Sequence, residues 1–401
     1  MSNIKNTQHN DWGTSYGQLV WQQFNKNKAN LVCMWFIITL FTIAVLAPFI
    51  ANDKPFAIRI DGQLRFPIFS TLTANDYSVF LAAIITVIMV LLVKRNGRKV
   101  DPFMRGSIFM HQVFVCVFIL AMGIALLQTF IPRKLDATDY KTMLASGKAT
   151  NAVFPIVPYG YARTDIRLSQ TPPTKDHWLG TDDVGSDVLC RLIHGTRVSL
   201  SVGFVAVGIS SVIGIIFGAV MGYFGGKIDF LGMRLLEIMM SVPTFFLIIT
   251  IVAFFPRSLF NIMVIIGITS WTGDARFVRA EFFKLRNQDF VQAAISLGLP
   301  LRSILFRHML PNGIAPVLVN LTFGIAGAIF IESALSFLGF GVAPPTPSWG
   351  QMLSTGVSTS GQFLWWLTLF PGLAIFFTVT AYNLLGEGLR DAIDPKLRKA
   401  V

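Results

Sequence analysis

Charged side chains are scarce in this sequence. Only 13% of its 401 residues are Asp, Glu, Lys or Arg, whereas 53% are hydrophobic. Charged residues make up about a quarter of an ordinary soluble domain, so a large soluble core is excluded. The composition instead indicates a polytopic membrane protein, in which each helical crossing needs about 20 apolar residues.

Catalytic and metal-binding patterns are also missing. The three cysteines, Cys33, Cys116 and Cys190, form no CxxC pair, which excludes a disulfide framework or a zinc site. The sequence has no phosphate-binding loop, no HExxH and no GxSxG. We therefore expect no enzyme activity, no bound metal and no cofactor held by this chain.

Eight apolar runs approach or reach the length of a membrane crossing. They predict an all-α polytopic membrane protein. The shortest are the second and the sixth. The eight runs are 31–50, 78–93, 108–131, 198–223, 234–255, 258–272, 313–339 and 363–386.

Basic residues predict the orientation of these crossings. The net charge is +12, and Lys and Arg gather before the first run, after the second, after the sixth and after the eighth. With eight crossings these segments share one side, and basic segments stay in the cytoplasm. Both termini and the connection 273–312 are therefore expected in the cytoplasm. The loop 132–197 is expected outside, because long loops cross despite their charge.

The first 30 residues place aromatic side chains just before a crossing. Trp12, Tyr16, Trp21 and Phe24 favour a helix lying at the membrane interface, and a flexible tail is the alternative. Three aspartates precede the fourth run, and we expect them to cap helices. They are Asp182, Asp183 and Asp187.

Glycine recurs at every fourth position along the fourth run. Such a stripe lets a neighbouring backbone approach closely. It indicates either ordinary tight packing or a surface along which helices shift during gating. The stripe is Gly214, Gly218, Gly222 and Gly226.

Ionisable residues inside crossings are costly and often functional. His111 and Glu237 lie near the cytoplasmic ends of their runs, whereas Glu332 lies near the outer end of the seventh. Glu332 either bonds to nearby backbone and serine groups or belongs to a transport pathway or gate.

The connection 273–312 is unusually long for an ordered loop, and such loops are usually functional. Its first part predicts a helix, and Gly298 is placed to end it in a left-handed conformation. Pro300 then begins a second short helix, and Pro311 marks the return to the membrane. The residues expected to share the two inner faces are Phe290, Ala293, Ala294 and Leu297, then Leu301, Ile304, Leu305 and His308.

Two roles fit this bent pair. An amphipathic helix lying on lipid is one. A small, flat helix that docks into a groove of a partner protein is the other, and the paired alanines Ala293 and Ala294 favour it.

The spacing of small residues in this connection resembles the EAA loop of ABC-importer permeases. That loop has E-A-A, three residues, Gly, nine residues and I-x-L-P. Gln292 stands here for the Glu, and His308 stands for the Ile, as in the oligopeptide/dipeptide/nickel branch. The matched positions are Ala293, Ala294, Gly298, Leu310 and Pro311.

Further segments extend the resemblance over about residues 177–398. "HWLGTDDVGSDVLCRLIHGTRVSL", "ESALSFLGFGVAPPTPSWGQML" and "NLLGEGLRDAIDPKLR" are similar to the C-type permease of that branch. "IANDKPFAIRIDG" resembles a subgroup linked to import of longer peptides and antibiotics of the microcin C type.

The resemblance implies a type I ABC-importer transmembrane domain with about eight helices: a six-helix core plus two extra helices near the N-terminus. The implied parts are a cytoplasmic elbow (1–30), three N-terminal helices (31–131), an extracytoplasmic loop (132–197), the core permease (198–388) with its coupling loop (273–312), and a cytoplasmic tail (389–401).

It also implies a function, import of peptides across the inner membrane. The expected partners are a second permease subunit, two ABC ATPases that bind ATP and Mg, a substrate-binding protein and membrane lipid, but no nucleic acid. Glu332 and Trp349 are candidates for an outer gate. A proton-coupled secondary peptide transporter is the alternative. The residues implied to couple to the ATPases are Asp289, Gln292, Ala293, Ala294, Gly298, Arg302, Arg307, His308, Leu310 and Pro311.

Overall fold

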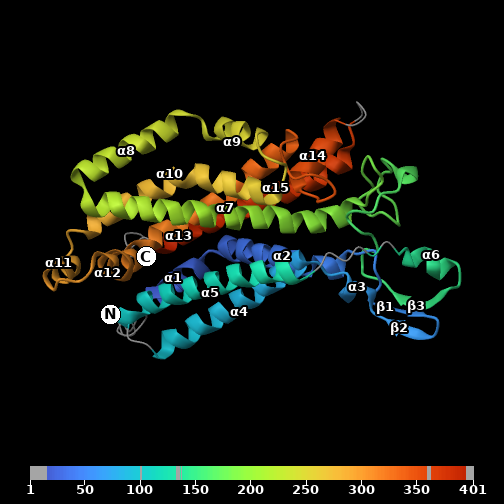
Figure 1. Cartoon of the computed structure of the whole chain (residues 1–401), viewed down its shortest axis with the longest axis horizontal. Helices are drawn as coiled ribbons and strands as arrows, with labels where there is room; N and C mark the ends of the chain where they lie inside the picture. Colours follow the sequence, from blue (N-terminus) through green and yellow to red (C-terminus); the bar gives the residue numbers. More distant parts are fainter. Residues whose placement is uncertain (1–15, 100–101, 132–135, 137, 359–362, 394–401) are drawn as a thin grey trace, which may run out of the picture.

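Long helices run side by side through most of the molecule (Figure 1). The computed structural model describes residues 16–99, 102–131, 136, 138–358 and 363–393. A small β-sheet lies at one end of the long axis, and the short helices α11 (Asp289–Ser296) and α12 (Leu301–Ser303) lie at the other (Figure 1). We call the end with the sheet the outer end and the end with α11 and α12 the inner end, as names for the two ends of the molecule. The predicted all-α membrane fold is confirmed, with this sheet as an addition.

Each predicted apolar run coincides with a helix or a bent helix pair. Within the described residues, five helices are long and apolar enough to span a membrane, and the pair α8–α9, bent by 75°, makes up to six. The helices that match the eight runs, in order, are α2 (Lys28–Ile50), α4 (Ala74–Lys99), α5 (Pro102–Phe130), α7 (Val188–Phe224), α8 (Gly226–Ser241) with α9 (Thr244–Ala253), α10 (Leu259–Leu285), α13 (Leu310–Phe337) and α15 (Trp365–Ile393).

Several of these helices are longer than predicted, and α7 is one of them. Helix α7 begins at Val188, before the predicted start at residue 198 and within the predicted loop 132–197. The Asp187 carboxylate caps it by accepting a hydrogen bond from the Cys190 N–H at 2.7 Å. Asp182 does not cap a helix: it accepts from the Ser186 N–H and pairs with Arg191 at 3.0 Å.

The N-terminal elbow is helical from Tyr16, as the aromatic pattern predicts. Helix α1 (Tyr16–Lys26) lies against α15, and the rings of Trp21 and Phe24 stack with centroids 5.9 Å apart. Trp12 lies outside the described residues. The inner ends of α15 and α2 meet here, where Gly388 fits closely against the Asn30 side chain.

The sheet joins two outer loops that are far apart in the sequence. Its strand order is β2-β1-β3, with both pairs antiparallel. Buried Ile58 and Tyr140 contribute to the small core beneath it. The apolar pattern predicts no strand at this end, because strands this short carry little periodicity. The elements of this end are β1 (Ala57–Ile60), β2 (Gln63–Arg65), α3 (Pro67–Ser70), α6 (Tyr140–Ala145), β3 (Ala149–Val153) and the 3-10 turn Ile166–Leu168, and α14 (Trp349–Ser358) follows α13.

Helix α7 is the centre of the bundle, and most of its contacts are with α10. The glycine stripe makes this possible. A Cβ added at Gly218 would lie 2.5 Å from the Ala275 carbonyl oxygen, and one at Gly222 would lie 2.6 Å from that of Arg279. Gly226 is an exception, because it lies beyond the end of α7 and a Cβ there would meet nothing.

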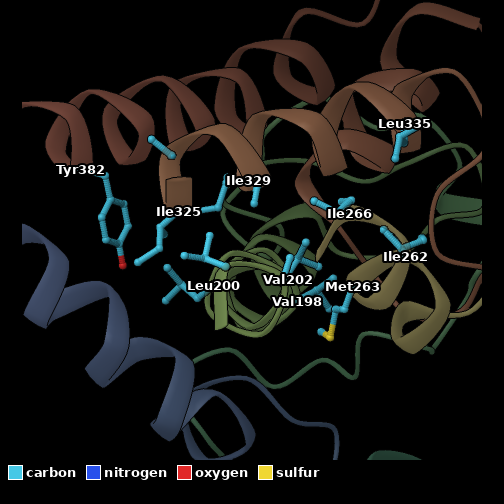
Figure 2. Packing of buried hydrophobic residues seen from close by; sticks show 14 of the residues in the cluster. Val198, Leu200, Val202, Ile262, Met263, Ile266, Ile325, Ile329, Leu335 and Tyr382 are labelled. Carbon is cyan, nitrogen blue, oxygen red and sulfur yellow. The ribbon is translucent and has the colours of Figure 1, made fainter. Parts of the chain in front are cut away.

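Buried aliphatic side chains fill the bundle beside and beyond the glycine stripe. Figure 2 shows them between α7, α10 and α13, with Tyr382 of α15 at the edge that faces α2. Since Val198 and Val202 precede the glycine stripe on α7, their part of the cluster lies on the outer side of the stripe.

Helices α4 and α5 form an antiparallel hairpin beside the core (Figure 1). Their described faces carry many exposed apolar side chains, as expected for a lipid-facing pair. At the outer end the Asp76 carboxylate at the start of α4 pairs with Arg197 of α7 at 2.5 Å, and both are largely buried. At the inner end α5 reaches the π-helix η2 (Ile304–Met309).

We predict that Gly218→Ala destabilises the protein by about 1–3 kcal/mol, because the new methyl group overpacks the α7–α10 contact. Gly208→Ala is the matched control, since a Cβ at that position of α7 meets no atom within 4 Å. The measurement is the midpoint of heat-induced aggregation of the purified protein. Equal midpoints for the two variants would contradict the packing role.

We predict that Asp76→Asn destabilises the protein by about 2–4 kcal/mol, because it leaves the largely buried Arg197 without its counter-charge. Glu237→Gln removes an exposed ion pair with Arg234 and should change stability by less than about 1 kcal/mol. The same heat-aggregation assay compares them, and a silent Asp76→Asn would show that the hairpin is held by other contacts.

Candidate functional site

The inner connection, residues 286–309, joins α10 to α13 at one end of the bundle. It is shorter than predicted, because α10 continues to Leu285 and only then gives way to α11, α12 and η2. Its buried side packs on the ends of α7, α10 and α13. The packed residues are Ala219, Val278, Phe282, Val291, Ala294, Ile304, Leu305, Met309, Leu310 and Val317.

Helix α11 begins and ends as its sequence predicts. Asp289 occupies the first turn, where a negative charge stabilises the helix N-terminus. Gly298 adopts a φ of 70° just beyond the end. The Leu299 N–H donates to the Ala294 carbonyl at 3.2 Å and the Gly298 N–H donates to that of Ile295 at 2.9 Å, which is a Schellman motif.

The predicted inner face of α11 is only partly right. Ala294 is buried, but Ala293 is exposed and Leu297 is 77% exposed. Val291 takes the inner position instead, since α11 has only two turns and Leu297 already belongs to its cap. Ala293 and Ala294 therefore differ in environment: Ala294 anchors the helix, and Ala293 lies at the surface.

The second predicted face is shifted by a π-helix. Ile304 and Leu305 are buried as predicted, but Leu301 is 39% exposed and Met309 replaces His308 on the inner side. A π-helix bonds residues five apart, so its buried positions are spaced more widely than in the α-helix that the prediction assumed.

Polar groups brace the inner connection from within. The Gln292 side-chain NH₂ donates to the Arg286 carbonyl at 2.9 Å, which ties α11 to the end of α10. The Arg286 guanidinium in turn donates to the Tyr223 carbonyl at 3.0 Å, at the end of α7. The His308 carbonyl accepts from the Asn312 side chain at 2.6 Å, in the first turn of α13 after Pro311.

The exposed side of the inner connection carries charged side chains that no ion pair with a described residue neutralises. In the described part of the chain, the exposed Arg302 and Arg307 form no ion pair. Exposed apolar side chains lie near them. We call this set, with Ala293, the docking face: Ala293, Ile295, Leu297, Leu301, Arg302, Phe306 and Arg307.

Glu332 and Trp349 are both fully buried, and they lie close together at the outer end. Glu332 is fully buried and accepts a hydrogen bond from Ser336 at 2.7 Å, as one of its two predicted roles requires. The Trp349 indole N–H donates to the Leu192 carbonyl at 3.1 Å, and the ring packs on Gly195. Their assignment to an outer gate stays a prediction.

The other predicted ionisable residues are less informative. Glu237 is exposed and paired with Arg234, and the His111 side chain lies outside the described residues. Among the described residues, no group of three or more His, Cys, Asp or Glu could hold a metal ion.

One buried carboxylate escaped the sequence analysis. Asp274 lies inside α10, between α7 and α13, and is 6% exposed. The sixth apolar run, 258–272, ends just before it, so the pattern does not place it in a crossing. The absence of any helix-breaking residue between Gly273 and Leu285 was the signal that α10 continues.

Two family models match this chain. Residues 214–399 match the model described as "Binding-protein-dependent transport system inner membrane component". Residues 15–67 match the "N-terminal TM domain of oligopeptide transport permease C". Both matches agree with the resemblance drawn from the inner connection.

Relatives of known name are similar over most of the chain. The "Oligopeptide transport system permease protein OppC" of Bacillus subtilis is 40% identical over 60% of this chain and 79% of its own length. The "Inner membrane ABC transporter permease protein YejE" of Escherichia coli is 32% identical over 94% of this chain and 96% of its own.

A third relative also spans the hairpin region. The "Peptidoglycan transport system permease protein YejE" of Agrobacterium fabrum is 31% identical over 94% of this chain and 92% of its own length. A solved amino acid ABC transporter aligns with 52% of this chain at 15% identity and a TM-score of 0.36, too low to carry an argument. The chain therefore belongs to the binding-protein-dependent transport system inner membrane components.

Proposed function

We propose that this chain is the permease subunit of an ATP-driven importer of peptides, of the OppC type. The observation that carries the proposal is the docking face on the inner connection, in a chain whose sequence has no ATP-binding loop. Relatives named as oligopeptide, dipeptide and peptidoglycan permeases support the substrate class.

The proposed partners follow from that role. Two ABC ATPases bind ATP and Mg and meet the docking face. A second permease subunit completes the pathway, and a substrate-binding protein delivers the peptide at the outer end. The pairing with a different permease, as a heterodimer, and the multi-pass place in the inner membrane are parts of the same proposal.

The orientation is proposed from the positive-inside rule and the shape of the chain. Helix α1 and the inner end of α15 lie at the same end of the bundle as the inner connection, which supports cytoplasmic placement of both termini (Figure 1). The β-sheet end is then extracytoplasmic. We propose the same order of segments along the chain as the sequence predicts. The coupling loop is shorter, at 286–309, and the core begins earlier, because α7 starts at Val188.

Coupling in this proposal runs through α10. ATP-driven closure of the ATPases shifts α11, which Gln292 and Arg286 tie to the ends of α10 and α7. The buried cluster under α11 transmits the shift to α13. Packed helices that slide against each other then open the pathway to alternating sides. The glycine stripe permits small sliding movements between α7 and α10.

A proton-coupled peptide symporter is the rival reading. Asp274, a carboxylate buried within the bundle, is a feature that such a transporter also shows. Family membership favours the ATP-driven mechanism, because the matched family comprises binding-protein-dependent components.

We predict that Ala293→Glu reduces uptake to background and abolishes substrate-stimulated ATP hydrolysis, while the subunit still folds. A large charged side chain within a docking face weakens partner binding by about 2 kcal/mol or more. Ala293→Ser is the matched control and should transport normally. Normal transport by Ala293→Glu would show that the docking face does not bind the ATPases. Ala294→Glu is a second comparison, and it should fail to fold because Ala294 is buried.

We also predict that ATPase subunits with phosphate-binding loops co-purify with this chain from native membranes. In proteoliposomes the purified complex should take up peptides only with ATP, and vanadate should stop it. Peptide uptake by this chain alone, driven by a proton gradient, would instead establish the symporter.

A further inference from the structure

Asp274 lies well inside the bundle. It precedes the inner end of α10 at Leu285 by 285 − 274 = 11 residues, and Asn320 follows the start of α13 at Leu310 by 320 − 310 = 10 residues. At about 1.5 Å per residue, both positions are roughly 15 Å from the inner ends of their helices. Arg276, Arg279 and Lys284 follow Asp274 on α10, so the carboxylate lies toward the inner end of the crossing.

Neutral groups surround this carboxylate. The Ser210 hydroxyl donates to Oδ2 at 2.6 Å, and the Asn320 side-chain NH₂ donates to Oδ1 at 2.5 Å. The Ser211 hydroxyl approaches Oδ2 at 3.4 Å. Within the described part of the chain, Asp274 forms no ion pair with Lys, Arg or His.

A cavity of about 310 Å³ lies against Asp274 and is walled by α7, α10 and α13. Since a water molecule occupies about 30 Å³ of liquid, this space is roughly that of ten waters. Gly273 and Gly327 line it, are exposed, and would meet no atom within 4 Å if a Cβ were added. The cavity therefore reaches the surface of the bundle between α10 and α13.

The lining changes character across the cavity. Ser210, Ser270 and Asn320 surround the carboxylate, whereas Val207 and Ile331 belong to the opposite, apolar part. A single charge beside an apolar wall suits a ligand with one cationic group on an aliphatic stem. An ammonium group offers three N–H donors, and a carboxylate has about four acceptor sites, of which Ser210 and Asn320 occupy two at short distance.

A purely structural role is the alternative. Hydroxyl and amide groups hold membrane helices together through hydrogen bonds. An asparagine at position 274 would satisfy the same serine hydroxyls without placing a charge inside the bundle. Hydrogen bonding between the helices therefore does not explain why a carboxylate lines an open cavity at this position.

We propose that this cavity binds the cationic group of a passing peptide, with Asp274 as its counter-charge. The assignment of the cation to a peptide rests on the proposed function. The carboxylate accepts charge-assisted hydrogen bonds from a terminal ammonium or a lysine side chain, and Ser210 and Asn320 hold it in position. Asp274 is thus a residue that determines which peptides the permease passes readily.

Thiol labelling tests the cavity directly, without any transport. Cys33, Cys116 and Cys190 are replaced by alanine, and Gly327→Cys places one thiol in the cavity wall of the assembled complex. The rates of modification by a cationic and an anionic methanethiosulfonate are measured with and without ATP and vanadate. The cationic reagent should react faster, and Asp274→Asn should lower the cationic-to-anionic rate ratio about tenfold.

Glu387→Gln is the matched control, since it removes one exposed carboxylate from α15, away from the cavity. It should leave the rate ratio unchanged. Gel filtration confirms that each variant assembles. An unchanged ratio in Asp274→Asn, or a thiol that neither reagent reaches in either nucleotide state, overturns the cation site.

Peptide uptake tests the identity of the cation. Asp274→Asn and the parent complex are compared with two peptides of equal length, one with and one without lysine, both at concentrations that saturate the binding protein. Uptake of the lysine peptide should fall several-fold relative to the neutral one. If the labelling ratio changes but the uptake ratio does not, the cavity selects cations and the peptide assignment is wrong. If no peptide is transported at all, the proposed function fails while the labelling result stands.

Discussion

The close contact between α7 and α10 is the constraint on which the rest of the bundle depends. Three glycines remove the side chains that would separate the helices, so backbone meets backbone at Gly218 and Gly222. At Gly214 the neighbour is Asp274 itself, whose Cβ would lie 2.4 Å from an added methyl group. One glycine stripe therefore fixes both the spacing of the two helices and the position of the buried carboxylate.

Much of this architecture was predictable from the sequence. The eight apolar runs located the long helices, and Gly298 and Pro300 located the bend of the inner connection, because turn chemistry acts over a few residues. The register within the connection was not predictable. A π-helix at Ile304–Met309 is stabilised by the tertiary packing of Met309 and Leu310, which no local pattern reveals. The outer sheet was missed in part for the same reason, since β1 and β3 pair across almost a hundred residues, whereas β1 and β2 form a local hairpin through Asp61 and Gly62.

The candidate sites also differ in whether local sequence or tertiary packing creates them. The docking face could be named from spacing and resemblance, although only Ala293 of the alanine pair proved to be exposed. Asp274 could not be named, because its importance comes from helices that converge from three parts of the chain. The hairpin α4–α5 shows the opposite case: it was located from the sequence, but its anchoring ion pair between Asp76 and Arg197 required the structure.

The length of α10 gives its contact with α7 a mechanical meaning. The contact is long: it extends from Gly267, where an added Cβ would lie 2.9 Å from the Ala206 carbonyl oxygen, to Phe282, which meets Gly222. These positions are 282 − 267 = 15 residues apart, or roughly 22 Å. Helices that touch over such a length resist tilting against each other, so a push at the inner connection displaces α10 along its axis, in the same direction at both ends.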